Sequence, residues 1–92
     1  MKTTAELQVI PIGTGISVRK EVVRVVELLQ EYNLIIETHA AGSDIEGEMS
    51  EVLKAVEHIH NTLHDEGTIR LISYLKLETR IDKPPTINGK RL

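Results

Sequence analysis

Apolar and polar residues alternate near the start of the chain in the way that is typical of a β-strand. Leu7 and Val9 fall on one side of such a strand, and Glu6 and Gln8 fall on the other. Pro11 cannot donate a hydrogen bond to a neighbouring strand, so we expect the strand to end or bulge there. The same period of two predicts four strands, at residues 5–12, 34–41, 44–49 and 68–79.

Two stretches between these strands have apolar residues at every third or fourth position, which is the spacing of one face of an α-helix. The first covers residues 17–32, and its apolar stripe consists of Val18, Val22, Val25, Val26, Leu29 and Tyr32. The second covers residues 50–65 and begins with Ser50, a residue type that caps helices well. Its stripe consists of Val52, Leu53, Val56, Ile59, His60 and Leu63.

The predicted order is strand, helix, strand, strand, helix, strand. Two helices can cover only one face of a four-stranded sheet, so this order predicts an α+β fold of the ferredoxin-like βαββαβ type, with an antiparallel sheet. We expect residues 1–82 to form this single domain and residues 83–92 to form a C-terminal tail. Pro84 and Pro85 prevent the last strand from continuing, so we expect the tail to be loose or to lie on a neighbouring subunit.

The uncovered face of the predicted sheet is both apolar and charged. Its predicted apolar residues are Ile10, Ile12, Ile35, Ile72 and Tyr74. A surface of this kind is typical of an interface, so we expect a homo-oligomer. The charged residues of the same face are Glu6, Glu37, Glu46, Glu48, Glu78, Arg70 and Lys76, and His39 joins them. Such a concavity between subunits suits a small organic cation or a hydrogen-bonding heterocycle, although the glutamates can also be simply solvated or paired with Lys76 and Arg70.

Composition narrows the function classes further. The 92 residues are 40% hydrophobic and 27% charged, which suits one globular domain. The absence of cysteine excludes disulfides and thiolate metal centres. Only two aromatic residues and a net charge of −3 argue against nucleic-acid binding. No apolar run is long enough to cross a membrane and the polar N-terminus does not resemble a signal peptide, so we expect a cytoplasmic protein.

Other residues offer weaker signals for chemistry. His60 and His64 have the i, i+4 spacing that can bind one metal ion, but a third ligand is not evident and a hydrogen-bonded core histidine is the commoner outcome. Residues 13–17 can hold an anion at a helix start, yet they match neither a dinucleotide fingerprint nor a P-loop. No nucleophile and base are recognisable together, so we expect no catalytic residues, no metal and no enzyme activity.

Three segments carry a resemblance to a known family. They are Val-Ile-Pro-Ile-Gly at residues 9–13, Gly-Ser-Asp-Ile-Glu-Gly-Glu at residues 42–48, and the stretch from Arg70 to Asp82. In order and spacing they resemble the small thiamine-binding protein family, over residues 5 to about 82. The resemblance implies ferredoxin-like subunits that assemble into dimers and commonly into tetramers, a dimer of dimers.

The resemblance also implies a function. It implies non-catalytic binding of thiamine or its hydroxymethylpyrimidine moiety at a subunit interface, with no cofactor required. Ser43, Glu46 and Glu48 occupy matching motif positions and are the ligand contacts that the family implies. His39 and Tyr74 are added from their predicted place on the uncovered face. The alternative is a ferredoxin-like regulatory or oligomerisation module with no ligand of the thiamine type.

Overall fold

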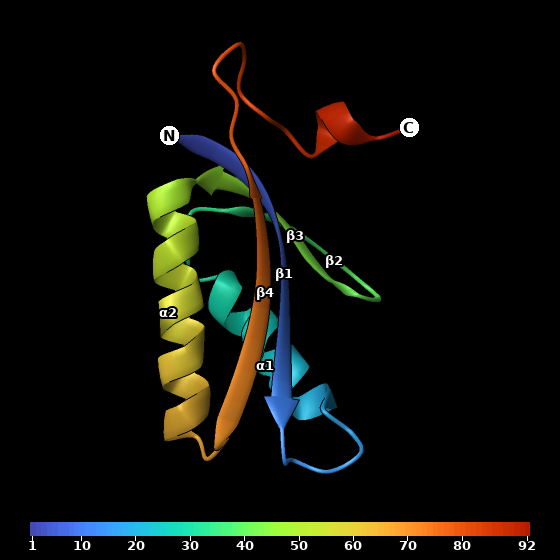
Figure 1. Cartoon of the computed structure of the whole chain (residues 1–92), viewed down its shortest axis with the longest axis vertical. Coiled ribbons are helices and arrows are strands. Elements are labelled where there is room, and N and C mark those ends of the chain that lie inside the picture. Colours follow the sequence, from blue (N-terminus) through green and yellow to red (C-terminus); the bar gives the residue numbers. More distant parts are fainter.

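The first strand of the chain lies in the middle of the sheet. In the computed structural model, which describes all 92 residues, β1 (Lys2–Ile12) pairs antiparallel with β3 (Gly42–Glu48) and with β4 (Arg70–Glu78). The remaining strand, β2 (Ile35–His39), pairs antiparallel with β3 and forms a hairpin with it. The order β2-β3-β1-β4 confirms the predicted four-stranded antiparallel sheet (Figure 1).

Two helices cover one side of this sheet and complete the predicted ferredoxin-like architecture. They are α1 (Arg19–Leu29) and α2 (Met49–Asp65). Burying one leucine or isoleucine in such a core contributes about 1.5–3 kcal/mol. The Tyr32 hydroxyl and His58 Nδ1, 2.9 Å apart, join the end of α1 to α2. The buried core consists of Ala5, Leu7, Val25, Leu28, Leu29, Ile45, Val52, Ala55, Ile59 and Leu63.

The strand β1 runs straight through its proline. Pro11 pairs with Leu71 of β4 in unbroken register, so the expected end or bulge at this position is wrong. The pairing of β1 with β3 stops at Leu7, so one edge of β1 is free beyond that residue. A proline is tolerated where a strand has a free edge. The sheet therefore narrows to two strands, β1 and β4, at this end of the molecule.

The first helix is shorter than its apolar pattern predicts. It begins at Arg19, two residues after the predicted start, and no side chain caps it. It ends at Leu29 because the following turn tightens: the Glu31 and Tyr32 amides donate to the carbonyl oxygens three residues before them. The predicted stripe is also displaced, since Val22 is exposed whereas Leu28 is fully buried.

The second helix begins one residue before the predicted cap. The Met49 amide donates to the carbonyl oxygen of Met1 at 2.9 Å, so the residue before β1 satisfies a donor that a capping side chain usually takes. Ser50 therefore lies inside the first turn, and no side chain caps this helix. On its core side Ala55 is buried, whereas Leu53, which the pattern places in the core, is 48% exposed.

The molecule is one sheet and one helix layer thick. Its extents are 44 × 26 × 19 Å. Both α-helices of the chain lie on the same side of the sheet and enclose the core against it. The other side of the sheet thus has no second layer. None of the helices combines the length and the apolar character that crossing a membrane requires.

Candidate functional site

The side of the sheet opposite the helices, called the open face below, carries the charged residues that the alternation predicts. Glu6 of β1 lies between Asp44 of β3 and Lys76 of β4. Glu37 of β2 pairs with Asp44 and so extends the same row across the sheet. The register of the strands places the following predicted residues together on the open face: Glu6, His39, Glu37, Glu46, Glu48, Arg70, Tyr74, Lys76 and Glu78.

The C-terminal tail folds back over the upper end of the open face. After β4 the chain rises, turns and crosses toward β2 and β3, where Asn88–Lys90 form a short 3-10 helix (Figure 1). The Ile87 amide donates to Glu46 Oε1 at 2.8 Å, and Pro85 is buried. The expectation of a tail that is loose or lies on a neighbouring subunit is therefore wrong for this chain: the tail packs on its own sheet.

Contact with the tail buries Glu46. Only 7% of this residue is exposed, although it lies on the open face. Its two carboxylate oxygens have different partners, because Oε1 accepts the Ile87 amide and Oε2 lies 3.7 Å from Lys2 Nζ. A buried carboxylate needs such partners to offset its lost hydration. Glu46 therefore holds the tail on the sheet in this structure.

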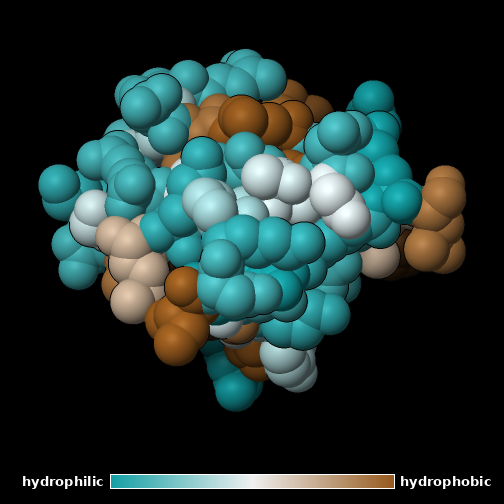
Figure 2. Space-filling model, turned by 90° about the horizontal axis from the view of Figure 1, so that it is seen from above, coloured by the Kyte–Doolittle hydropathy of each residue, from teal (hydrophilic) through white to brown (hydrophobic).

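Two cations at the end of the tail pair with carboxylates on opposite edges of the sheet. Lys90 Nζ lies 2.6 Å from Glu78 Oε1 on β4, and Arg91 Nη2 lies 2.5 Å from Glu37 Oε2 on β2. The hydrogen bond from Lys90 is the main reason that the pKa of Glu78 is lowered from its usual value. Seen from this end, the surface is mostly hydrophilic, with apolar residues in separate spots (Figure 2).

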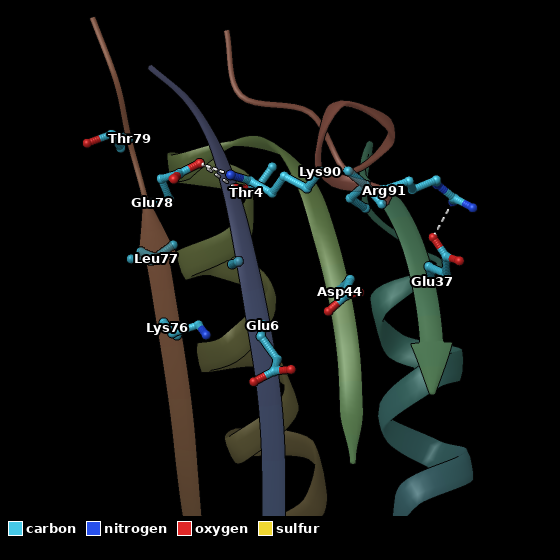
Figure 3. Close-up of a pocket in the computed structure, with 12 residues that line it drawn as sticks. Thr4, Glu6, Glu37, Asp44, Lys76, Leu77, Glu78, Thr79, Lys90 and Arg91 are labelled. Carbon is cyan, nitrogen blue, oxygen red and sulfur yellow. Dashed lines mark hydrogen bonds and ion pairs between the residues drawn. The ribbon is translucent and has the colours of Figure 1, made fainter. Parts of the chain in front are cut away.

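A cavity of about 810 Å³ lies between the open face and the tail. Figure 3 shows Lys76, Glu6 and Asp44 on neighbouring strands, with Lys90 and Arg91 across their upper ends. Both signs of charge therefore meet in one open space. The residues that line it are Thr4, Ala5, Glu6, Glu37, Asp44, Lys76, Leu77, Glu78, Thr79, Ile87, Lys90 and Arg91.

His39 joins two of the lining carboxylates in a small cluster. Its Nε2 lies 3.1 Å from Asp44 Oδ1 and 3.5 Å from Glu6 Oε2. The three groups are close enough to hold a metal ion, since one ligand atom of each lies within 4.8 Å of the others. The hydrogen bonds favour another arrangement, because the Ala41 amide donates to His39 Nδ1 at 3.3 Å.

That amide fixes the tautomer of the ring. An Nδ1 atom that accepts a hydrogen bond carries no proton, so in the neutral imidazole the proton is on Nε2. Nε2 then donates to Asp44 Oδ1, with Glu6 Oε2 3.5 Å away, and has no free lone pair for a metal ion. A histidine that binds metal through Nε2 usually donates from Nδ1, which is the reverse of this geometry. The cluster is therefore a hydrogen-bond network that holds two carboxylates in place.

Three predicted ligand contacts lie away from the cavity. Ser43 is buried on the helix side of the sheet, where its hydroxyl lies 3.1 Å from that of Thr38. Tyr74 is on the open face, 64% exposed, but it does not line the cavity. Glu48 lies beside the N-terminal ammonium group at 2.7 Å, and the hydrogen bond from that group lowers its pKa. Of the predicted contacts, only Glu46 and His39 touch residues that form the cavity.

Gly47, between the two predicted glutamate contacts, serves the packing of the chain itself. It pairs with Thr3 on the helix side of the sheet. A Cβ atom at this position would lie 2.6 Å from Leu34 Cδ2 and 3.4 Å from the carbonyl oxygen of Asn33. The close approach at this glycine is therefore made by the residues that lead into β2.

His60 and His64 are both engaged in hydrogen bonds on the helix side. His60 Nε2 lies 2.6 Å from Ser73 Oγ, and His64 Nδ1 donates to the carbonyl oxygen of Thr68 at 2.7 Å. These contacts favour the core-histidine interpretation over a metal site.

The helix start at residues 13–17, considered as an anion site, lies beside a second cavity of about 870 Å³. Cations and carboxylates line this cavity together, among them Arg19, Lys20, Glu21 and Glu66, and this mixture does not favour an anion.

Several residues that line the cavity are not among the predicted ligand contacts. The sequence pattern indicates the position of only some of them. Asp44 shares the parity of Glu46 and Glu48 in β3, so alternation alone places it on the open face. The same parity places Ser43 on the opposite side. For Lys90 and Arg91 no periodic signal exists, because the tail has no regular pattern that predicts where it returns.

Comparison with known proteins gives a family. A family model described as thiamine-binding protein matches residues 5–91, which includes both the sheet and the returning tail. The UPF0045 protein MJ1052 of Methanocaldococcus jannaschii is 40% identical over 89 residues, covering 97% of this chain and 88% of that protein. The UPF0045 protein sll0230 of a Synechocystis strain is 37% identical over 90 residues, covering 98% of this chain and 74% of that protein.

Solved structures agree with the fold. The crystal structure of MJ1052 superposes with a TM-score of 0.91 and covers 97% of this chain and 91% of that one. A Thermotoga maritima protein, provisionally described as a thiamine biosynthesis or salvage protein, superposes with a TM-score of 0.86 at 20% identity. It covers 98% of this chain and 95% of that one, and at this identity the likeness concerns the fold alone.

Proposed function

Because the chain belongs to the thiamine-binding protein family, we propose that it binds thiamine or the hydroxymethylpyrimidine moiety of thiamine and catalyses no reaction. The observation that carries this proposal is the cavity between the open face and the tail. Its volume of about 810 Å³ is within the range of small-molecule sites. Its lining offers both carboxylates and an ammonium group, which suits a ligand with hydrogen-bond donors and acceptors.

The row of charges across the strands matches the chemistry of an aminopyrimidine. Such a ring has an exocyclic amino group that donates and ring nitrogens that accept. Glu6 and Asp44, held by His39, can accept from the amino group. Lys76 has no carboxylate of this chain within ion-pair distance, so its ammonium group is free to donate to a ring nitrogen.

Binding without catalysis is part of the proposal. The chain has no cysteine, and the lining hydroxyls of Thr4 and Thr79 have no histidine beside them among the hydrogen bonds of the structure. His39 supports its two carboxylates, and its Nδ1 accepts a backbone amide. It is therefore placed to position neighbouring groups, whereas a general base needs a nitrogen directed at the substrate.

We further propose that a second copy of the chain covers the part of the open face that the tail leaves bare. There Tyr74 is 64% exposed and Ile72 is 37% exposed, beside Ile10 and Ile12, which are half-buried. Apolar surface of this kind is typical of an interface. The assembly expected from the family, a dimer of dimers, would place the ligand site next to a subunit boundary.

Isothermal titration calorimetry tests the ligand proposal. We expect heat of binding with thiamine, its phosphates or the pyrimidine alcohol at millimolar ligand. The double change Glu6→Gln, Asp44→Asn is expected to weaken binding by roughly 10- to 100-fold, because it removes charge-assisted hydrogen bonds. Glu48→Gln is the matched control, since this glutamate lies outside the cavity and its loss leaves the affinity unchanged.

Two results would contradict the proposal: no heat with any of these compounds, or unchanged affinity in the double variant. The bare apolar part of the open face supports the alternative function, a ferredoxin-like regulatory or oligomerisation module. Under that alternative none of the compounds raises the melting temperature, whereas substitution of Tyr74 or Ile72 still dissociates the oligomer. Melting curves with and without ligand therefore separate the two functions.

A further inference from the structure

The tail changes the charge of the proposed ligand cavity. The strands alone contribute the carboxylates of Glu6, Glu37, Asp44 and Glu78 to its lining. Against them they contribute a single cation, Lys76. The returning tail adds the positive charges of Lys90 and Arg91 (Figure 3). A strongly acidic surface thus becomes a cavity with nearly balanced charge.

The two tail cations are held in place by contacts of the tail that do not involve charge alone. The Ile87 amide donates to the buried Glu46 carboxylate at 2.8 Å, and Pro85 is itself buried. The Gly89 amide donates to Thr86 Oγ1 at 2.9 Å and so closes the turn that precedes Lys90. Lys90 and Arg91 are therefore brought to opposite edges of the sheet, where each forms an ion pair with a strand carboxylate.

We propose that Lys90 and Arg91 set the charge preference of the site, disfavouring a cationic ligand while leaving a neutral aminopyrimidine little affected. This inference rests on the proposed function and deepens it, since thiamine is a cation and its hydroxymethylpyrimidine moiety is neutral. Glu37 and Glu78 already have their counter-charges at 2.5 and 2.6 Å. A cationic ligand must either displace these side chains or bind near two positive charges.

Calorimetry on the full chain tests the inference with thiamine and the pyrimidine alcohol as probes. We expect Lys90→Gln, Arg91→Gln to raise the affinity for thiamine by roughly tenfold, because two unit charges are removed from within several ångströms of a partly solvated site. The affinity for the neutral alcohol is expected to stay within about twofold, since it carries no charge for these residues to repel. Arg91→Gln alone is expected to raise the affinity for thiamine by about threefold, because it removes one of the two charges. This single change leaves the Lys90 ion pair and the anchor at Glu46 in place.

The matched control is Lys54→Gln, Lys83→Gln, which removes two positive charges outside the cavity and is expected to change neither affinity. If both ligands bind but the tail variants change both affinities equally, or neither, the charge-preference inference is wrong and the proposed function stands. If neither ligand binds the wild type or any variant, the proposed function is wrong and the inference is overturned with it. Selective gain of thiamine affinity in the tail variants supports both.

Discussion

His60 links the helix layer to the sheet through one short hydrogen bond. Its Nε2 atom on α2 lies 2.6 Å from Ser73 Oγ on the helix side of β4. Burial lowers the pKa of His60 from the usual histidine value, and the positive charge that His64 can carry lowers it further. The folded protein therefore binds a proton at this site less readily than the unfolded chain does.

Stability should consequently fall as the solution is acidified from about pH 7 to pH 5.5, because the unfolded chain takes up the proton first in this range. At higher pH both states are neutral at this position and the effect disappears. Thermal unfolding across this range is expected to give a falling melting temperature in the wild type and a flatter profile in His60→Gln. His39→Gln, which leaves His60 in place, serves as the control. A wild-type profile as flat as that of His60→Gln would contradict the lowered pKa of His60 in the folded protein.

Individual residues of the site differ in how far the sequence predicts them. The alternation of β3 places Glu46 on the open face correctly, and the same parity explains why Asp44 belongs to the cavity and Ser43 does not. Burial of Glu46 was not predictable, because it depends on a tail residue 41 positions later. Local periodicity determines which way a strand residue points. It contains no information about which distant segment of the chain covers that residue.

Among the elements, α1 owes its position to two fully buried leucines, Leu28 and Leu29. Its valines are poor helix formers, so packing has to stabilise it. Leu28→Ala is expected to lower the free energy of unfolding by about 2–5 kcal/mol, because this side chain is only 1% exposed and its loss leaves a cavity.

The matched control for Leu28 lies on the other helix. Leu53→Ala on α2 is expected to cost less than about 1 kcal/mol, because Leu53 is 48% exposed. Urea unfolding measures both changes. Equal losses for the two variants would mean that the displaced helix stripe described above is incorrect.

The number and order of the elements follow from the sequence, but their ends do not. Period-two and helical spacing predict all four strands and both helices. The end points depend on partners that lie far away in the chain. The Met49 amide finds the Met1 carbonyl oxygen, which starts α2 before Ser50. Pro11 remains in β1 because the neighbouring strand has already ended.

The assembled subunit presents two distinct halves on its open face. One half is charged and covered by the tail, and the other is the narrow end of β1 and β4, which begins at the Gln8–Tyr74 pair and leaves Tyr74 exposed. The proposed self-association predicts that the wild type is larger than one 10.3 kDa chain at micromolar concentration. Tyr74→Glu is expected to dissociate it, because a buried interface does not tolerate an unpaired charge.

Light scattering measures the mass of both proteins. Lys54→Glu, on the exposed surface of α2, is the control and should keep the wild-type mass. A wild type with the mass of one chain would contradict the proposed assembly. It would leave the ligand proposal intact, because the cavity described here is built from residues of a single chain.

The tail over the cavity has a consequence for how such proteins diverge. The side chains that hold the two layers together belong to the strands and helices, whereas Lys90 and Arg91 lie in a short segment outside that core. Under the proposed charge preference, replacements of these two residues would change which ligands the cavity binds without removing any side chain of the core. Related proteins with nearly the same fold can therefore differ in ligand preference through a few substitutions in this segment.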